Sequence, residues 1–261
     1  MQQKVKIVSS WSRPGGGTVA HIALTNLLND NGYDCTFYGK HDWHLDKCQG
    51  GLIKDCVIYP DDILISHFIE IPKNTKTKKH ILYCHEKDVF PIKAARWDVS
   101  QYDKIVYVSE EQKAWQDVDH PSEVIPPVVD KFEWEAPEEK VAGIVGSVDW
   151  NKQVHQSVNR ALSRGYDKVL LFGEVNDTPY YEEYVKRYVD SGQLVLAGHE
   201  DDREALYAQV SEVFHSSISE TYGLVEAECR LSGIPFNGKS NNQLILEKEE
   251  ILNKWKTILE S

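Results

Sequence analysis

Two acidic residues with a helical pattern between them carry the clearest chemical signal in the sequence. Glu220 and Glu228 lie eight positions apart, and the three-to-four spacing of Leu224, Ala227 and Leu231 predicts a helix with one inward face. Glu228 falls on that face, where a carboxylate is costly unless it gains partners. Glu220 comes just before the helix, where exposed backbone N–H groups favour an anion. Acids for hydroxyl groups and a helix start for phosphate indicate a nucleotide sugar, although an ordinary cap and flank position would give the same spacing.

The segment from Glu220 to Glu228, followed by Gly233–Pro235, resembles the E-x7-E motif of retaining GT-B glycosyltransferases, notably family four. The resemblance implies that Glu228 accepts hydrogen bonds from ribose hydroxyl groups and that Glu220 holds hydroxyl groups of the donor sugar. It also implies a phosphate site at the backbone between them. The predicted donor-binding positions in this segment are Thr221, Tyr222, Gly223 and Leu224.

Lys152 is a third candidate for action on the donor. It follows the strand predicted at Val141–Gly146, in a region that resembles the family pattern G-R-L-x-x-x-K-G, whose Arg and Lys bind the diphosphate. Lys152 keeps the lysine position, but Ser147 stands at the arginine position and Gln153 at the final glycine. We expect Lys152 to offset charge on the leaving diphosphate. Either backbone dipoles suffice beside it, or another base such as Arg13 substitutes for the missing arginine.

A further group of candidates lies in the first half of the chain. Gly15, Gly16 and Gly17 follow the first predicted strand and open a helix, which suits close approach to phosphate or a sugar hydroxyl and also suits a tight turn. The resemblance implies a glycine-rich loop that faces the donor diphosphate and the acceptor. His85 follows a predicted strand, and the family has a comparable His-acid step whose histidine contacts the donor sugar. His67 is a weaker candidate, and a hydrogen-bonded structural role is the alternative for both histidines.

The elements that must position these residues alternate between β-rich runs and helical patterns, which is typical of a parallel α/β protein. Ligands of such sheets bind at the carboxyl ends of the strands. The fold class is therefore α/β, and the resemblance implies a GT-B-like pair of Rossmann-like parallel-sheet domains facing a cleft. The predicted strands are Val5–Ser9, Cys35–Tyr38, Ile63–Ser66, Ile81–Cys84, Ile105–Ser109, Val141–Gly146, Val169–Phe172, Leu194–Ala197 and Val213–His215. The predicted helices are Thr18–Asn31, Tyr180–Ser191, Glu204–Gln209 and Gln243–Leu259.

The predicted domain organisation follows the same alternation. Residues 1–132 form an N-terminal Rossmann-like domain on the acceptor side, and residues 141–242 form the nucleotide-sugar-binding domain. The Glu- and Pro-rich stretch 133–140 has few apolar residues to bury and is the expected linker. Residues 243–261 are the expected C-terminal helix.

Composition limits the class of protein. The chain has 261 residues, of which 41% are hydrophobic, and this is enough for globular cores. No apolar run reaches membrane-span length, and the five cysteines lack the spacing of a disulfide framework or zinc site, so we expect a cytoplasmic protein. The net charge of −12 opposes broad nucleic-acid binding. The lysine-rich stretch 73–79 is a local exception, either a solvated loop or a contact surface for an anionic acceptor.

Together these features predict a retaining glycosyltransferase, with Glu220, Lys152 and His85 as catalytic residues. We expect no cofactor and no metal, with a UDP-sugar as the donor substrate. A carbohydrate or lipid-linked acceptor is favoured, and a modified DNA base of the viral type is the alternative acceptor. Two other functions stay open: a non-catalytic protein that binds nucleotide sugars, and a GT-B nucleotide-sugar epimerase.

Overall fold

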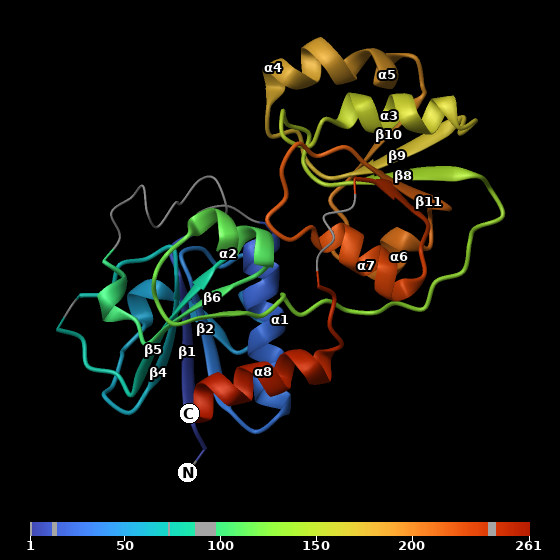
Figure 1. Ribbon diagram of the computed structural model, residues 1–261. Coiled ribbons are helices and arrows are strands. Elements are labelled where there is room, and N and C mark those ends of the chain that lie inside the picture. The colour runs from blue at the N-terminus through green and yellow to red at the C-terminus, as the bar shows by residue number, and fades with distance from the viewer. Residues whose placement is uncertain (1, 12–14, 73, 87–97, 240–243) are drawn as a thin grey trace. The chain divides into compact units, whose positions relative to one another are not determined.

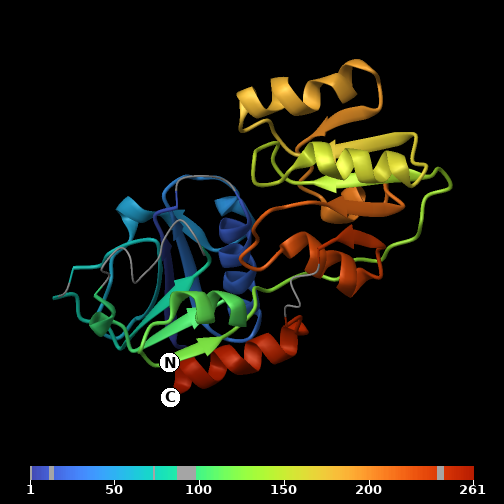
Figure 2. The same ribbon diagram turned by 45° about the horizontal axis from the view of Figure 1, so that its top comes forward.

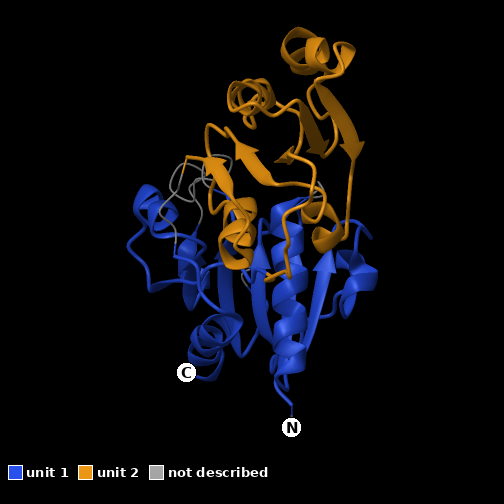
Figure 3. Cartoon of the chain, turned by 90° about the vertical axis from the view of Figure 1, so that its right-hand side faces the viewer, with its two compact units in different colours: residues 1–129, 243–261 blue, residues 130–242 orange. Residues whose placement is uncertain are grey.

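The computed structural model describes residues 2–11, 15–72, 74–86, 98–239 and 244–261, and these form two compact units (Figures 1 and 3). Unit 1 comprises Met1–Val129 together with Gln243–Ser261, and unit 2 comprises Asp130–Asn242. The last segment of the chain therefore belongs to the same unit as the first. Each unit has its own parallel sheet and its own core.

The described part of unit 1 is built on a seven-stranded parallel sheet with the strand order β3-β2-β1-β4-β5-β6-β7. The central strands β1 and β4 are almost continuously buried runs, as expected where helices or loops cover both faces of a parallel sheet. Pairing begins with Val5 opposite Ile63, which sets β1 beside β4. The strands are β1 (Lys4–Ser9), β2 (Asp34–Gly39), β3 (Gly50–Leu52), β4 (Ile63–His67), β5 (Lys79–Cys84), β6 (Lys104–Tyr107) and β7 (Ser122–Val124).

The longer helices of unit 1 are α1 (Gly16–Asp30), α2 (Glu110–Gln116) and α8 (Lys248–Glu260). Helix α8 packs beside α1 (Figure 1). It buries Trp255 completely, edge-on to the Tyr83 ring at a centroid distance of 5.2 Å. The short 3-10 turns are η1 (Leu45–Lys47), η2 (Ile53–Asp55) and η3 (Val99–Gln101).

The end of α8 is fixed to unit 1 by polar contacts. The Tyr33 hydroxyl donates to Glu260 Oε1 over 2.6 Å, and Lys79 Nζ donates to the Ser261 carbonyl over 2.7 Å. The sequence-based start of this helix was too early. Residues 244–247 are not helical and Gln243 lies outside the described residues, while the Glu250 side chain accepts from the backbone N–H of Glu247 just before the helix.

Unit 2 is a second doubly covered parallel sheet, with five strands in the order β10-β9-β8-β11-β12 among its described residues. One face carries α3 and the helical segment α4–α5, and the other carries α6 and α7 (Figures 1 and 2). The strands are β8 (Val141–Val145), β9 (Lys168–Phe172), β10 (Leu194–Gly198), β11 (Glu212–His215) and β12 (Phe236–Gly238). The helices are α3 (Val154–Ser163), α4 (Thr178–Tyr180), the π-helical turn η4 (Tyr181–Val185), α5 (Lys186–Asp190), α6 (Arg203–Tyr207) and α7 (Leu224–Ser232).

The predicted strands are confirmed to within a few residues. The helices α2 and α3, the short strands β3, β7 and β12 and the 3-10 turns η1, η2 and η3 were not predicted. The segment expected to link the halves belongs to unit 2, and Trp134 in it packs on the unit 2 core and donates its indole N–H to the Tyr207 carbonyl over 3.1 Å. Within the described residues, no helix is both long enough and apolar enough to cross a membrane.

Candidate functional site

The order of strands in unit 2 reverses at β8, which lies between β9 and β11. Ligands of open parallel sheets bind at the carboxyl ends of the strands at such a reversal. The loop after β8 carries Lys152, and the loop after β11 carries Glu220. The fold therefore brings two residues that are 68 positions apart to the same edge of one sheet.

Glu220 lies between two donors. Lys152 Nζ is 2.5 Å from Glu220 Oε1, and His215 Nε2 is 3.0 Å from the same oxygen. Burial alone would raise the pKa of the Glu220 carboxyl, but the hydrogen bond from His215 and the charge of Lys152 outweigh it and lower the pKa from 4.5 to about 2. Glu220 is therefore a fixed negative charge at neutral pH.

The backbone around Lys152 is shaped by two glycines. Gly146 has a φ of +137°, and a Cβ added at Gly173 would lie 2.1 Å from the Gly146 carbonyl oxygen. Only glycine fits at Gly173, because no side chain can share that space. The Asp149 carboxylate accepts from the Lys152 backbone N–H over 2.9 Å, which fixes the start of the lysine side chain.

Asn151 joins the Lys152 loop to the Glu220 loop. Its side chain donates to the Ser219 carbonyl over 3.0 Å and accepts from the Ser219 N–H over 3.1 Å. Its carbonyl accepts from the Ile218 N–H over 2.8 Å. No sequence pattern points to Asn151, since its partners are distant in sequence and come together only through the sheet.

The two departures from the family pattern are accommodated locally. The Ser147 hydroxyl donates to Asp149 over 2.5 Å, so this position braces the loop. Gln153 stands where the pattern has glycine and adopts φ +48°, a left-handed conformation that costs a non-glycine residue roughly 1 kcal/mol. Arg13, the suggested substitute cation, lies outside the described residues.

Glu228 is buried on α7, with an exposed fraction of 6%, so the prediction that it faces inward is confirmed. Of the apolar residues that defined the predicted face, Ala227 is fully buried, while Leu224 and Leu231 are half-buried. The Tyr207 hydroxyl donates to Glu228 Oε2, and Arg203 Nε lies 3.5 Å from Oε1. Neither partner was identified from the sequence.

Burial raises the pKa of Glu228, and the opposing charge of Arg203 and the hydrogen bond from Tyr207 only reduce that shift. Asp130 adds a further upward contribution to the same pKa. The two acids of the motif therefore have opposite pKa shifts.

The remaining predicted donor-binding positions lie together at the start of α7. Gly223 precedes the helix with φ +86°, a conformation that favours glycine, and α7 begins at Leu224. Thr221 and Tyr222 lie between Glu220 and this glycine, and Tyr222 is 5% exposed. Their contact with phosphate stays a prediction.

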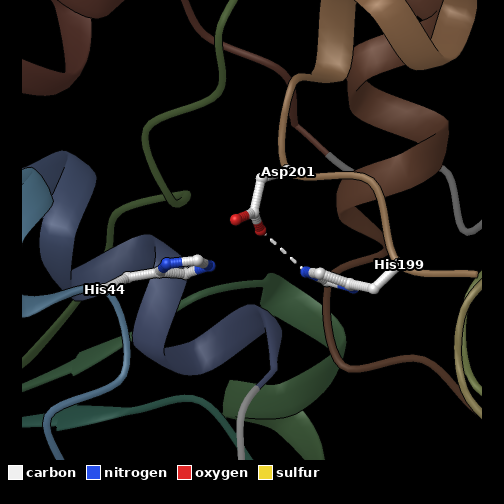
Figure 4. A group of neighbouring side chains, drawn as sticks. All are labelled: His44, His199 and Asp201. Atoms are coloured by element: carbon white, nitrogen blue, oxygen red, sulfur yellow. Dashed lines mark hydrogen bonds and ion pairs between the residues drawn. The ribbon is translucent and has the colours of Figure 1, made fainter.

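Arg203 and Tyr207 both lie on α6, which follows the loop after β10. Asp202 accepts from the Ala205 N–H over 3.1 Å and caps the helix. In the same loop, His199 Nε2 and Asp201 Oδ1 are hydrogen-bonded at 2.8 Å (Figure 4).

In unit 1, the glycine-rich loop and His85 are brought together. Helix α1 begins at Gly16, and a Cβ added at Gly17 would lie 3.9 Å from His85 Cβ, His67 Cε1 and Glu86 Oε1. Gly15 has open space around its Cβ position. These residues lie at the end of β4 or after β1 and β5, so they occupy the carboxyl edge of the unit 1 sheet.

His67 is more extensively bonded than the sequence suggested. Its Nδ1 is 2.7 Å from Ser9 Oγ, and its Nε2 is 2.7 Å from Glu86 Oε2. Glu86 thus has one oxygen committed to His67, while the other is directed toward the start of α1 near Gly17.

His85 lies in a cluster of aromatic rings. Its centroid is 4.6 Å from that of His21 and 4.2 Å from that of Tyr83, and among the described residues its Nε2 is buried without a hydrogen-bond partner. Burial and the nearby His67 lower the pKa of His85 well below 6.5. His85 is therefore neutral at physiological pH, and its role as a contact to the donor sugar stays a prediction.

The lysine-rich stretch lies elsewhere in unit 1, toward the amino ends of β4 and β5. Lys76 and His80 line a cavity of about 480 Å³ there, while Lys79 is engaged at the end of α8. Lys73 lies outside the described residues. The role of the stretch 73–79 as a contact surface for an anionic acceptor stays a prediction.

Comparison with known proteins identifies the fold. No family model matches the chain, and no curated protein matches its sequence. Among solved structures, HepE of Anabaena in complex with UDP-glucose is similar, with a TM-score of 0.69 and 13% identity over 99% of this chain and 90% of that one. AviGT4, a glycosyltransferase of avilamycin A biosynthesis, gives 0.62 and 17% over 91% and 78%. WaaG, a glycosyltransferase of lipopolysaccharide biosynthesis, gives 0.62 and 12% over 98% and 90%.

The chain has the GT-B fold, with two Rossmann-like parallel-sheet units, and the fold class predicted from the sequence is confirmed.

Proposed function

We propose that the protein is a retaining glycosyltransferase that transfers a sugar from a UDP-sugar to an acceptor hydroxyl. The observation that carries this proposal is the Lys152–Glu220–His215 cluster at the carboxyl ends of β8 and β11. A cation beside a fixed carboxylate suits a sugar diphosphate, which presents negative charge next to hydroxyl groups. Similarity to HepE with bound UDP and UDP-glucose, and to two glycosyltransferases, supports this donor class.

Each side chain of unit 2 has a distinct proposed role. Lys152 offsets charge that develops on the leaving diphosphate, and the backbone at the start of α7 binds phosphate. Glu220 accepts hydrogen bonds from the donor sugar. Glu228 binds the ribose hydroxyl groups through its carboxylate. One oxygen of this carboxylate accepts from the Tyr207 hydroxyl.

The charge state of Glu220 supports retention of configuration. A general base works best with a pKa near the working pH, and a pKa of about 2 makes Glu220 a poor base at neutral pH. In the proposed step the acceptor oxygen attacks the anomeric carbon from the face of the leaving group. The bond to the diphosphate breaks, and its released oxygen takes the acceptor proton. No cofactor takes part.

The acceptor that we propose is a carbohydrate or lipid-linked hydroxyl. A net charge of −12 repels polyanions such as DNA, which makes a modified DNA base the less favoured acceptor. WaaG and AviGT4, which share the fold, act in lipopolysaccharide and avilamycin A biosynthesis.

The first test is calorimetric titration of UDP, GDP and ADP into the wild type and Glu228→Gln. We expect UDP to bind most tightly and the variant to bind it about tenfold more weakly, since one good hydrogen bond to a charged group is lost. Glu212→Gln is a matched control. Glu212 also accepts from a tyrosine, Tyr166, over 2.7 Å and lies 3.8 Å from Arg164, but at the amino end of β11.

Equal loss of UDP affinity in both variants would remove the assigned role of Glu228. Absence of binding by any nucleotide would contradict the proposal as a whole.

UDP-sugars supplied to the wild type then separate the remaining functions. Transfer or hydrolysis supports the transferase, a changed sugar without transfer indicates an epimerase, and binding without turnover indicates a sensor. The anomeric coupling of the product, measured by NMR, reports whether configuration is retained.

A further inference from the structure

His215 is the member of the unit 2 cluster that no sequence pattern singled out. It ends β11, and its Nε2 lies 3.0 Å from Glu220 Oε1, the oxygen that Lys152 also contacts at 2.5 Å. One carboxylate oxygen thus has two donors, one from the loop after β8 and one from the end of β11.

The two donors differ in how firmly they are held. Lys152 reaches Glu220 through a flexible four-carbon chain and presents a compact charge that suits phosphate. His215 is fixed by its strand, with its ring 5.9 Å from that of Phe236 and its carbonyl accepting from Arg160 Nη1 over 3.3 Å. Its side chain is only 11% exposed. A diphosphate can attract Lys152, whereas His215 has little freedom to leave.

We propose that His215 is a positioning residue that holds the Glu220 carboxylate in place when Lys152 moves from Glu220 to the donor diphosphate. This inference rests on the proposed function. Without His215, the departure of Lys152 would leave Glu220 buried with neither of these donors. Burial is the largest influence on its pKa and favours the neutral acid, which binds the sugar hydroxyls less well.

Other charged groups contact the backbone of Lys152 and of His215. Asp149 accepts from the Lys152 backbone N–H, and Arg160, on α3, donates to the carbonyl of His215. His215 needs only an Nε2–H to donate to an ionised Glu220, so a neutral tautomer suffices. A neutral amide can therefore replace it, and this provides a conservative variant.

The test separates His215 from the proposed function by imitating the departure of Lys152 without a ligand. In Lys152→Met, the pKa of Glu220 is measured by carboxyl carbon NMR and compared with Lys152→Met combined with His215→Leu or with His215→Gln. We expect a pKa below 4.5 in the single variant, a rise of at least one unit with His215→Leu, and restoration with His215→Gln, whose amide reaches a similar position. Equal pKa values in all three would overturn the proposal.

Catalysis provides the second readout. With UDP-glucose, His215→Leu alone should lower kcat at least tenfold and move the acid limb of the pH profile upward, and His215→Gln should recover most of both. His155→Leu is the control. His155 lies on α3, and its Nδ1 is 2.8 Å from the Tyr180 hydroxyl rather than near Glu220. A drop in kcat with an unmoved acid limb would reduce His215 to a packing role and overturn the proposal. If the wild type does not use UDP-sugars, the proposed function fails, and the NMR comparison still decides the role of His215.

Discussion

Glu220 and Glu228 belong to one short segment, yet their surroundings shift the pKa values of the two carboxyl groups in opposite directions. Glu220 lies in a loop, where Lys152 and His215 converge on it and lower its pKa to about 2. Glu228 lies on a helix, where the burial of its side chain raises its pKa. Its main partners are the neutral hydroxyl of Tyr207 and, at 3.5 Å, Arg203.

The difference shows how one fold gives two glutamates of the same short segment opposite electrostatic surroundings. Two donors on one oxygen make Glu220 a permanent negative charge, which is the state that we propose for binding the donor sugar. Glu228 carries a charge that its buried position opposes, so hydroxyl groups from a ligand would improve its surroundings. Burial of the Glu228 carboxylate destabilises the free protein, and hydrogen bonds from ligand hydroxyl groups would offset that cost and so favour binding.

Loss of the lysine beside Glu220 should have the largest effect. Lys152→Met should lower turnover of UDP-glucose by about 100-fold or more, which is typical when a group that stabilises transition-state charge is removed. The measurement is the rate of UDP release at saturating donor. Lys168→Met is the control, because Lys168 is half exposed and lies 3.5 Å from Glu139. Equal rates in the wild type and Lys152→Met would remove Lys152 from the site.

The opposite pKa shifts predict opposite effects on stability. Glu220 has a folded pKa below 4.5, so its contribution is present above that pH and is lost as pH falls toward 2. Glu220→Gln should therefore lower the free energy of unfolding by about 3 kcal/mol at pH 7.5, with a smaller difference at pH 4.

Glu228 has a raised folded pKa, so its protonated form stabilises the fold at low pH and that stability is lost as pH rises. Glu228→Gln should raise the unfolding temperature by a few degrees at pH 7.5 and have little effect at pH 4. Thermal unfolding at both pH values checks both variants. Shifts of the same sign at pH 7.5 would show that the two surroundings are not electrostatically opposed.

Unit 1 offers a smaller effect that sharpens the comparison. His85→Gln should lower turnover of UDP-glucose about tenfold, the cost of one hydrogen bond to the sugar, and leave UDP affinity unchanged because UDP lacks that sugar. Parallel calorimetry and UDP-release rates make the distinction. A loss of UDP affinity would instead place His85 against the nucleotide or in a structural role.

Local sequence predicted much of the framework. The strands β1 and β4 could be predicted because a parallel sheet covered on both faces needs continuous apolar strands, and both strands are buried runs. The inward position of Glu228 followed from helical periodicity. The short polar helix α2 was missed, although Ser109 caps it by accepting from the Gln112 N–H over 3.2 Å, because seven residues give little periodic signal.

The sequence by itself determined most of the alternation of strands and helices, the loop-to-helix step between Glu220 and Glu228, and the position of Lys152 after a strand. Tertiary structure alone decided which groups meet: His215 and Lys152 on Glu220, Asn151 between two loops, and the Tyr207 hydroxyl on Glu228. The physical reason is that periodicity reports burial within one element. The charge on a carboxyl depends on donors brought to it by the order of strands in the sheet.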